Sequence, residues 1–437
     1  MHKHHSSHDT RGVRHGTGVR VSGILAPGTV LSGILVFCLA SAGVGCGART
    51  GINRATDAGP HQPSREGNKP FDTGHIVKDH GVIDQRVIDQ RVIDQRVSDQ
   101  RVIDQGIDAP PPTLSRQLDI LFVIDNSATM DRKQDRLIAQ FPELLAALHR
   151  AEPKGTLPDI HIGVVSTDVG AGPFNLKSCE NPLGDNGRLQ IPRPSANCKA
   201  PIDPWIRYAN GKTNIPGCDG ANPADGARCV EQAFACIAAL GTEGCGFEQP
   251  LEAARRALDQ DPGHNVNPGF IRPNARLAII FLTDEDDCSA ATPTLFDPQD
   301  VGINSPLGPL TSFRCFEFGV QCDVNDRHKV GPRKHCRPAD GKWLHHPMDY
   351  APFFAKLKPN YRQIKVWPIA GPAGTVSVGV ENFAPKLMPI CTNSDGGGNA
   401  VPAIRLNYLA NHFGDVLTSI CSKDLFTYMI RAVLAWQ

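Results

Sequence analysis

The segment Leu118-Asp-Ile-Leu-Phe-Val-Ile-Asp-Asn-Ser-Ala-Thr-Met130 decides the fold of this chain. Its apolar first half predicts a strand that is buried on both faces, as strands of parallel sheets are. The strand ends in three oxygen-bearing side chains at alternate positions, Asp125, Ser127 and Thr129. A tight loop there can aim all three at one point, and one carboxylate with two hydroxyls suits a hard cation such as Mg²⁺, Mn²⁺ or Ca²⁺. An ordinary Asx-type turn after the strand is the alternative.

Further strands and helices alternate along the chain from this segment onward. Buried strands are predicted at 117–124, 159–166, 275–282 and 364–370, with helices at 131–150, 230–240, 248–258, 350–357, 401–413 and 424–436. An edge strand is expected around 188–191, inside the first of two cysteine-containing insertions at 170–228 and 288–345. This alternation implies an α/β fold, a doubly wound and mostly parallel sheet with helices on both faces. Ligands of such sheets bind at the carboxyl ends of the strands.

A second oxygen-rich loop follows the strand at 275–282. It reads Thr283-Asp-Glu-Asp-Asp287, and its Asp284 follows a strand end as Asp125 does. Bringing two carboxylates together without a cation costs repulsion and raises one pKa, so their approach favours a bound ion. A solvated acidic loop is the alternative.

Three segments resemble the von Willebrand factor type A (VWFA) family. Residues 120–130 are similar to that family's first strand and D-x-S-x-S loop, with Thr129 in the last serine position. Residues 281–285 resemble its fourth strand, whose terminal aspartate completes a metal site, and residues 241–257 resemble the helix after its second metal loop. The resemblance covers residues 115–435 and is interrupted by the two insertions.

The resemblance implies a doubly wound sandwich with a metal-ion-dependent adhesion site. In such a site the ion keeps one coordination position for an acidic group of the partner. Carried over to this chain, Asp125, Ser127 and Thr129 form the first loop, Asp284 forms the third, and the ion is Mg²⁺ or Ca²⁺.

One loop of the family's site departs from the pattern. The position of the second-loop threonine falls near Cys245 or Gly246, and neither is a hard ligand. Thr242 is the nearest hydroxyl, and Glu248 is a carboxylate substitute. An incomplete or vestigial metal site therefore stays open as an alternative.

The N-terminus predicts export. Residues 1–20 are basic and residues 21–45 are apolar and small, the layout of a secretory signal peptide. The signal runs into Cys46 and so resembles that of a bacterial lipoprotein, with lipidation at Cys46, although Gly43 stands where leucine is usual. An uncleaved transmembrane anchor, or cleavage by ordinary signal peptidase after the Ala42-Gly region, are the alternatives. We expect a cell-envelope protein, an outer-membrane lipoprotein or a cell-surface protein held to the membrane by its lipid.

Residues 46–113 predict a disordered linker. They contain tandem pentapeptides of the type Val-Ile-Asp-Gln-Arg over residues 82–105 and end near the prolines at 110–112. A period of five matches neither a helix nor a strand, so a spacer between membrane and domain is expected. A short β-solenoid is the alternative. The folded domain is expected at 114–437.

The cysteines favour disulfide bonds. Of 14 cysteines, the 12 from Cys179 onward make an even number in a loop-rich chain, which is typical of an oxidising compartment. Disulfides between cysteines that are close in sequence are plausible, namely Cys179 with Cys198, Cys236 with Cys245, and Cys322 with Cys336. Free cytosolic thiols are one alternative. A zinc site is another, drawn from Cys315, Cys322, His328, His335, Cys336, His345 and His346.

Charge and motifs narrow the function. Lys plus Arg and Asp plus Glu both total 45, which argues against nucleic-acid binding by a general basic field. The chain has no G-x-S-x-G, H-E-x-x-H or phosphate-loop motif, so we expect a binding protein rather than an enzyme. The expected partner is a protein or a polysaccharide. A structural envelope protein with no working metal site, and a secreted hydrolase with Ser127 as nucleophile, are the alternatives.

Overall fold

The computed structural model describes residues 116–152, 157–192, 198–218, 223–299, 301–392 and 398–436. All of them belong to one compact unit, Gln105–Gln437. The predicted signal peptide, the lipidation site Cys46 and the pentapeptide linker lie outside the described residues. Among the residues that are described, no helix is both long and apolar enough to cross a membrane.

A seven-stranded sheet in the order β14-β9-β5-β1-β2-β3-β4 forms the centre of the unit. Its strands are β1 (Gln117–Ile124), β2 (Asp159–Ser166), β3 (Ile206–Ala209), β4 (Lys212–Thr213), β5 (Arg276–Leu282), β9 (Ile364–Ala370) and β14 (Thr418–Ser419). The strands β14, β9, β5, β1 and β2 pair in parallel, whereas β3 and β4 pair antiparallel at one edge. The predicted mixed α/β class with a mostly parallel sheet is confirmed.

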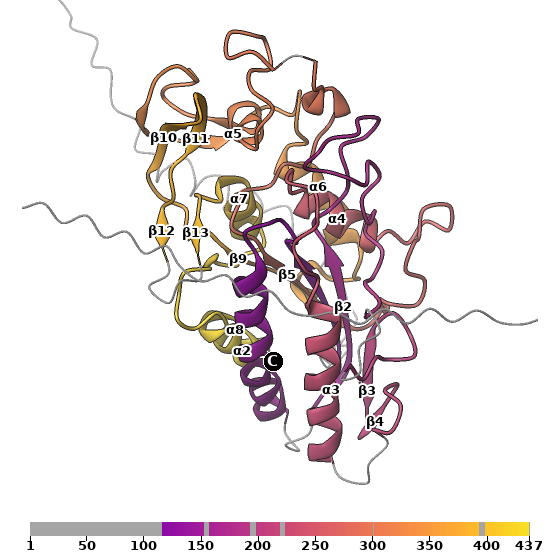
Figure 1. The fold of residues 1–437 in the computed structure, drawn as a ribbon. Coiled ribbons are helices and arrows are strands. Elements are labelled where there is room, and N and C mark those ends of the chain that lie inside the picture. Colours follow the sequence, from indigo (N-terminus) through magenta and orange to yellow (C-terminus); the bar gives the residue numbers. More distant parts are fainter. Residues whose placement is uncertain are drawn as a thin grey trace, which may run out of the picture. The chain divides into compact units, whose positions relative to one another are not determined.

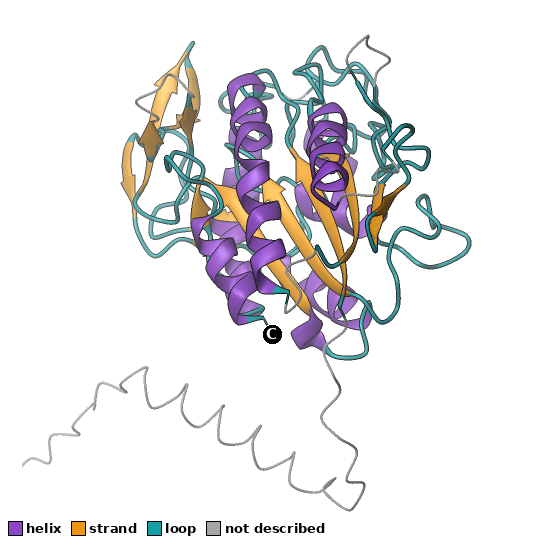
Figure 2. Cartoon of the chain, turned by 90° about the horizontal axis from the view of Figure 1, so that it is seen from below, coloured by secondary structure: helices purple, strands orange, loops and turns teal. Residues whose placement is uncertain are grey.

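Helices cover both faces of this sheet (Figures 1 and 2). They are α2 (Asp131–Ala151), α3 (Pro223–Ala238), α4 (Pro250–Ala257), α5 (Phe313–Gly319), α6 (Pro347–Lys356), α7 (Ile404–His412) and α8 (Thr427–Ala435). The helices α2, α3 and α8 share one apolar core with the sheet, and α4, α6 and α7 share the other. The described residues also contain two short 3-10 turns, η2 (Pro293–Phe296) and η3 (Tyr361–Gln363).

Side chains along β1 point alternately to the two faces of the sheet, so β1 contributes residues to the apolar core on each face. Phe122 enters the core of α2, α3 and α8, while Leu121 and Val123 on either side of it enter the opposite core. Around Phe122 the rings of Phe141 and Phe234 stack on each other, with centroids 3.7 Å apart. A strand buried on both faces must be apolar throughout, which is why the uninterrupted run in the sequence identified it.

Residues of the two insertions and of the loop before α4 form a third, smaller apolar cluster. It contains Phe247 and Phe296, whose ring centroids lie 4.7 Å apart, together with the half-cystines of two disulfides. The remaining strands are short, namely β6 (Val320–Gln321), β7 (Gly331–Arg333), β8 (Arg337–Pro338), β10 (Val376–Glu381), β11 (Ala384–Leu387), β12 (Cys391–Thr392) and β13 (Asn399–Ala400). Of these, β10 and β11 form an antiparallel hairpin whose β10 also pairs with β7.

Six disulfides crosslink the loops in the described part of the chain, which indicates folding in an oxidising environment. They are Cys179–Cys245, Cys198–Cys236, Cys218–Cys229, Cys288–Cys315, Cys322–Cys336 and Cys391–Cys421. Only one of the three suggested pairs, Cys322–Cys336, is confirmed. Because three cysteines of the suggested zinc group are bonded as disulfides, that group has no free thiol.

The other two suggested pairs are wrong because the loops meet across the fold rather than along the sequence. The loop before α4 folds back onto the loop after β2, and the Gly246 amide donates to the Ser178 carbonyl at 2.8 Å. This contact brings Cys245 to Cys179, and Cys236 on α3 then pairs with Cys198.

The edge strand predicted at 188–191 is also wrong. Only one ladder-like bond forms there, from the Gln190 amide to the Val164 carbonyl at 2.8 Å, and Pro192 cannot extend the pairing. On the side of β2 away from β1, the strand that pairs with it is β3, whose Ile206 lies opposite Ile162. Its short amphipathic sequence gave too weak a signal among the loops.

The contacts among the rings of Phe122, Phe141 and Phe234 generate a stability prediction. Phe234→Ala should lower the free energy of unfolding by about 3–5 kcal/mol, because a buried ring leaves a cavity in a close-packed core. Urea denaturation with the disulfides intact measures the change. Leu183→Ala, at a side chain that is 72% exposed, is the control and should stay within about 0.5 kcal/mol of wild type. Equal effects of the two substitutions would place Phe234 outside the core.

Candidate metal centre

The register of two neighbouring strands brings Asp125 and Asp284 together. Ile124 of β1 lies opposite Leu282 of β5, and the Asp125 amide donates to the Leu282 carbonyl at 2.9 Å. The Thr283 hydroxyl donates to Asp125 Oδ2 at 2.8 Å. Both aspartates are buried, with Asp125 fully enclosed and Asp284 6% exposed. The predicted pair of strand-end carboxylates therefore exists.

The first loop arranges its other oxygens around the same pair. The Ser127 amide donates to Asp125 Oδ1 at 2.8 Å, so the Asx-type turn is present as well. The Thr129 hydroxyl donates to Asp284 Oδ2 at 2.7 Å. Ser127 is half-buried and Thr129 is exposed, so this corner of the site reaches the surface.

A lysine that the sequence analysis missed lies within the site. Lys133 in the first turn of α2 places its Nζ 2.8 Å from Asp284 Oδ2 and 2.8 Å from the Thr129 carbonyl oxygen. Only 2% of the residue is exposed. Position 133 lies one helical turn before the buried Leu137, on the apolar stripe of the helix, and a lysine on that stripe was the available signal. The ammonium group provides a counter-charge for Asp284.

The second loop contributes Glu248 rather than a threonine. The Glu248 side chain is 1% exposed, its Oε2 accepts a hydrogen bond from the Thr167 hydroxyl, and its Oε1 is buried without a hydrogen-bond partner. Cys245 is tied up in a disulfide, and Gly246 has no side chain. Thr242 is half-buried in the same loop, which is fixed to the first loop by the Gly244 amide at 2.9 Å from the Asn126 carbonyl oxygen.

Burial and mutual repulsion raise the pKa values of these carboxyl groups. Burial first, and then the charge of Asp284, raise the pKa of Asp125 to about 6. The pKa of Glu285 is raised to about 8, again by burial and then by Asp284 and Asp125. Burial and the charge of Asp125 hold the pKa of Glu248 well above its usual range. The shared causes show that the carboxyl groups act on one another.

The rest of the acidic run is structural, so the solvated-loop alternative is wrong. Asp286 Oδ2 accepts hydrogen bonds from two backbone amides at the start of α7, that of Ile404 at 2.8 Å and that of Arg405 at 2.9 Å. Asp287 is fully buried, and its Oδ2 lies 2.8 Å from the guanidinium of the equally buried Arg405. These two aspartates position the loop and its helix.

The donor set fits a hard cation in part. Asp284 Oδ1 and Glu248 Oε1 are buried without hydrogen-bond partners, and both belong to carboxyl groups that repel their neighbours. A cation is a suitable partner for such buried carboxyl oxygens. Within the described ranges, no group of three or more His, Cys, Asp or Glu side chains is arranged to hold a metal ion. An ion here therefore depends on the hydroxyls of Ser127 and Thr129 and on water.

Comparison of the chain with models of known protein families and with curated proteins finds no match. The site must be judged by its own geometry, above all by the register of β1 and β5 and by the side chains gathered at their ends.

The raised pKa values predict a pH-dependent stability in the presence of a chelator. Folding raises the pKa of Asp125 and Glu248, so the folded chain binds more protons than the unfolded chain above about pH 4. The free energy of unfolding therefore falls as pH rises from about 4 to about 6, the raised pKa of Asp125, and Glu248 extends this fall toward higher pH. Urea denaturation of wild type and Glu248→Gln across this range should show the variant gaining relative stability with pH. A matched exposed substitution, Glu143→Gln, should not, and identical slopes for all three proteins would contradict the prediction.

Proposed function

We propose that residues 114–437 form a VWFA-like domain that binds a partner at the carboxyl ends of its parallel strands. Three features support this: the strand order, the antiparallel edge strand β3 beside β2, and the loops after β1 and β5 that carry Asp125 and Asp284. Open parallel sheets bind ligands at this edge. The expected partner is a protein or a polysaccharide, and the domain is a binding module rather than an enzyme.

The carrying observation is the imbalance of charge at this edge. Burial and the charges of neighbouring carboxylates raise the pKa values of Asp125, Glu248 and Glu285. The ammonium of Lys133 contacts Asp284 and none of these three carboxyl groups. We infer that Mg²⁺ or Ca²⁺ binds through Asp125, Ser127, Thr129 and Asp284, with Glu248 in place of the second-loop threonine. When bound, the ion supplies a coordination position for an acidic group of the partner.

Lys133 must leave Asp284 for the ion to bind. A divalent cation and an ammonium group would compete for the same oxygens, so binding includes the cost of breaking two hydrogen bonds of Lys133. A bound divalent ion would offset this cost, because it neutralises more carboxylate charge than one ammonium group does. We therefore propose that metal affinity is limited by Lys133.

A second candidate function rests on the same lysine. The side chain is buried and bonded on both sides of the site, as a permanent counter-ion would be. In that case the domain is a structural envelope module without a working metal site. The two candidates differ in whether removing the ammonium uncovers metal binding.

The envelope location is part of the proposal. The predicted signal peptide and Cys46 support export and lipid anchoring, with residues 46–113 as the spacer, and the six disulfides support an oxidising environment. Metabolic labelling with palmitate should mark the wild-type protein and not Cys46→Ser. Equal labelling of both proteins would overturn the anchor.

Calorimetric titration with Mg²⁺, Ca²⁺ and Mn²⁺ tests the metal proposal. Wild type should bind at least one of these ions, and Asp125→Ala should bind none of them. Lys133→Met should bind about tenfold more tightly than wild type, because about 1.4 kcal/mol of competition disappears with the ammonium.

The control for this titration is Lys356→Met, at an exposed lysine of α6, which should leave the affinity unchanged. Absence of metal-dependent heat in both wild type and Lys133→Met would sink the metal proposal and leave the structural candidate. Equal affinities of wild type and Lys133→Met would show that metal binds without competition from the lysine.

A further inference from the structure

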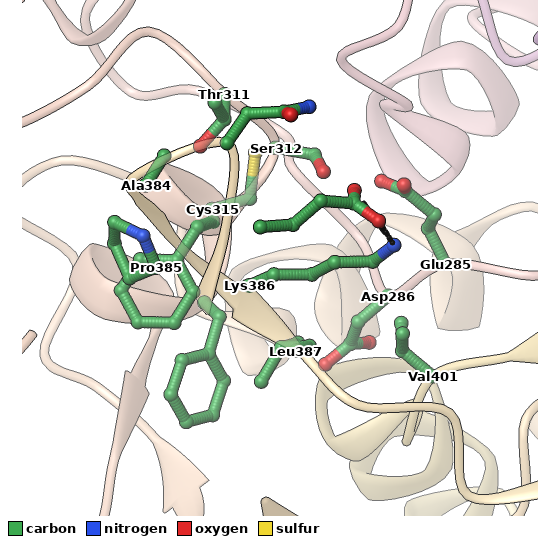
Figure 3. A pocket seen from close by; sticks show the side chains of 14 residues that line it. Glu285, Asp286, Thr311, Ser312, Cys315, Ala384, Pro385, Lys386, Leu387 and Val401 are labelled. Atoms are coloured by element: carbon green, nitrogen blue, oxygen red, sulfur yellow. Dashed lines mark hydrogen bonds and ion pairs between the residues drawn. The ribbon is translucent and has the colours of Figure 1, made fainter. Parts of the chain in front are cut away.

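Two of the hollows on the described surface differ in charge. The first, a cavity of about 450 Å³, lies between α5 and the β10–β11 hairpin, and Figure 3 shows Glu285 and Asp286 on one side of it. Lys386 and Glu381 of the hairpin line the same cavity and pair with each other. The second hollow is an open groove of about 690 Å³, and its lining contains basic side chains but no aspartate or glutamate.

Three segments of the chain form this groove. They are the loop that contains β7 and β8, the helix α7, and residues 373–375 between β9 and β10. Because β9 is parallel to β5, the residues that follow β9 leave the sheet at the same edge as Asp284. The groove therefore borders the edge at which open parallel sheets bind their ligands.

Three cations of the groove have no acidic partner among the described residues. Arg333 is 3% exposed, and its guanidinium donates only to backbone carbonyl groups of its own loop. The exposed Arg337 donates to the neutral side chain of Gln321 at 2.7 Å, and the exposed ammonium of Lys334 forms no ion pair. Their positive charges are therefore available to an anionic ligand.

One acidic side chain beside the groove offsets part of this charge. The Lys334 amide donates to Asp323 Oδ1 at 2.7 Å and lowers the pKa of that exposed carboxyl group. Three cations and one carboxylate leave an excess of two positive charges. The other charges of residues 322–338 cancel, Asp326 with Lys329 in number and Arg327 with Glu317 through an ion pair at 2.7 Å.

Crosslinks hold this basic loop, residues 322–338, in place. The disulfide Cys322–Cys336 joins its two sides. The Cys322 amide donates to the Asn325 side chain at 2.8 Å, and that side chain donates back to the Cys322 carbonyl at 2.9 Å. The buried guanidinium of Arg333 binds further carbonyl groups of the loop. A loop that is ordered before binding loses little conformational entropy when a ligand arrives.

The side chains of α7 favour a ligand that is rich in hydroxyl groups. Asn407 and Asn411 lie one helical turn apart along the groove, and neither side chain has a hydrogen-bond partner among the described residues. An amide side chain both donates and accepts, as the hydroxyls of a sugar do. Tyr408 between them is 43% exposed, and its ring meets the ring of His346 edge to face at 5.7 Å. Such a ring offers an apolar face and a hydroxyl to the same ligand.

We propose that this groove binds an acidic polysaccharide, a sugar chain that carries carboxylate groups. Lys334 and Arg337 contact the carboxylates, and Arg333 positions the loop and adds its charge. The amides of Asn407 and Asn411 bind sugar hydroxyls while Tyr408 packs against a sugar ring. The inference goes beyond the proposed function by naming a partner chemistry at a second place on the domain, and it does not require a bound metal ion.

A tetramer of galacturonic acid tests the groove. Calorimetric titration of the purified protein, with a chelator present, compares this tetramer with its full methyl ester and with a capped tetraglutamate peptide. The ester keeps the hydroxyls without the charge, and the peptide keeps the charge without the hydroxyls. The acidic tetramer should bind at least about tenfold more tightly than either. An equally tight ester would overturn the role of charge, and an equally tight peptide would overturn the sugar as ligand.

Four variants separate the groove from a general attraction of anions. Lys334→Gln and Arg337→Gln should each weaken the acidic tetramer about threefold to fivefold, as the loss of one exposed ion pair does. Tyr408→Ala should weaken the tetramer and leave tetraglutamate unchanged. Lys356→Gln, at an exposed lysine of α6 outside the groove, is the matched control and should change nothing.

Equal effects of Lys334→Gln and Lys356→Gln would contradict the proposal, because they would place the attraction outside the groove. Unchanged affinity of Tyr408→Ala for the tetramer would contradict sugar recognition by α7. Because these titrations contain chelator, they can succeed where the metal proposal fails, and the reverse.

Discussion

The pairing of β1 with β5 is the constraint on which the rest of the site depends. Both strands are buried on both faces and bonded in parallel, so the residues that follow them leave the sheet at the same edge. Asp125 and Asp284 occupy those two positions, and neither can move away without breaking the ladder or the bond from Thr283. Two ionised carboxyl groups that are held together out of water repel each other. A nearby positive charge or a bound proton is needed to relieve this repulsion.

Three kinds of positive charge can balance these carboxyl groups, and the lysine and a divalent cation compete for the same oxygens of Asp284. Protons do so through the raised pKa values of Asp125 and Glu248. The ammonium of Lys133 does so at Asp284 alone. A divalent cation would do so for several carboxyl groups at once. If Lys133 moved away and nothing took its place, Asp284 would be left as an unpaired buried charge. The entering metal ion must therefore take the place of the lysine ammonium beside Asp284.

The parts of the fold that the sequence could predict are those governed by local pattern. Uninterrupted apolar runs identified the buried strands, and the oxygen-rich loops after them located the edge at Asp125 and Asp284. Helix boundaries shifted by a few residues for local reasons. Pro402 lies just before α7, which begins at Ile404, and Asp424 Oδ1 accepts a hydrogen bond from the amide of Thr427, the first residue of α8.

The parts that could not be predicted depend on contacts between distant segments. Cys179 and Cys245 are 66 residues apart, and their pairing follows from the way two loops fold over the sheet. Lys133 lies on the apolar stripe of α2, but the stripe alone does not reveal that Asp284 lies beside it. The cavity beside Glu285 requires the β10–β11 hairpin, which is about 100 residues further along the chain. The disulfide and the cavity leave no periodic pattern in the sequence, and the helical period that marks Lys133 does not identify its partner.

The most direct measurement of the central claim is a crystal structure grown with Mn²⁺ and located by anomalous scattering. The account predicts an anomalous peak about 2.2 Å from the oxygens of Ser127 and Thr129, the distance typical of small hard cations, with Lys133 Nζ displaced from Asp284. A map with no peak at this edge and with Lys133 still bonded to Asp284 would contradict it.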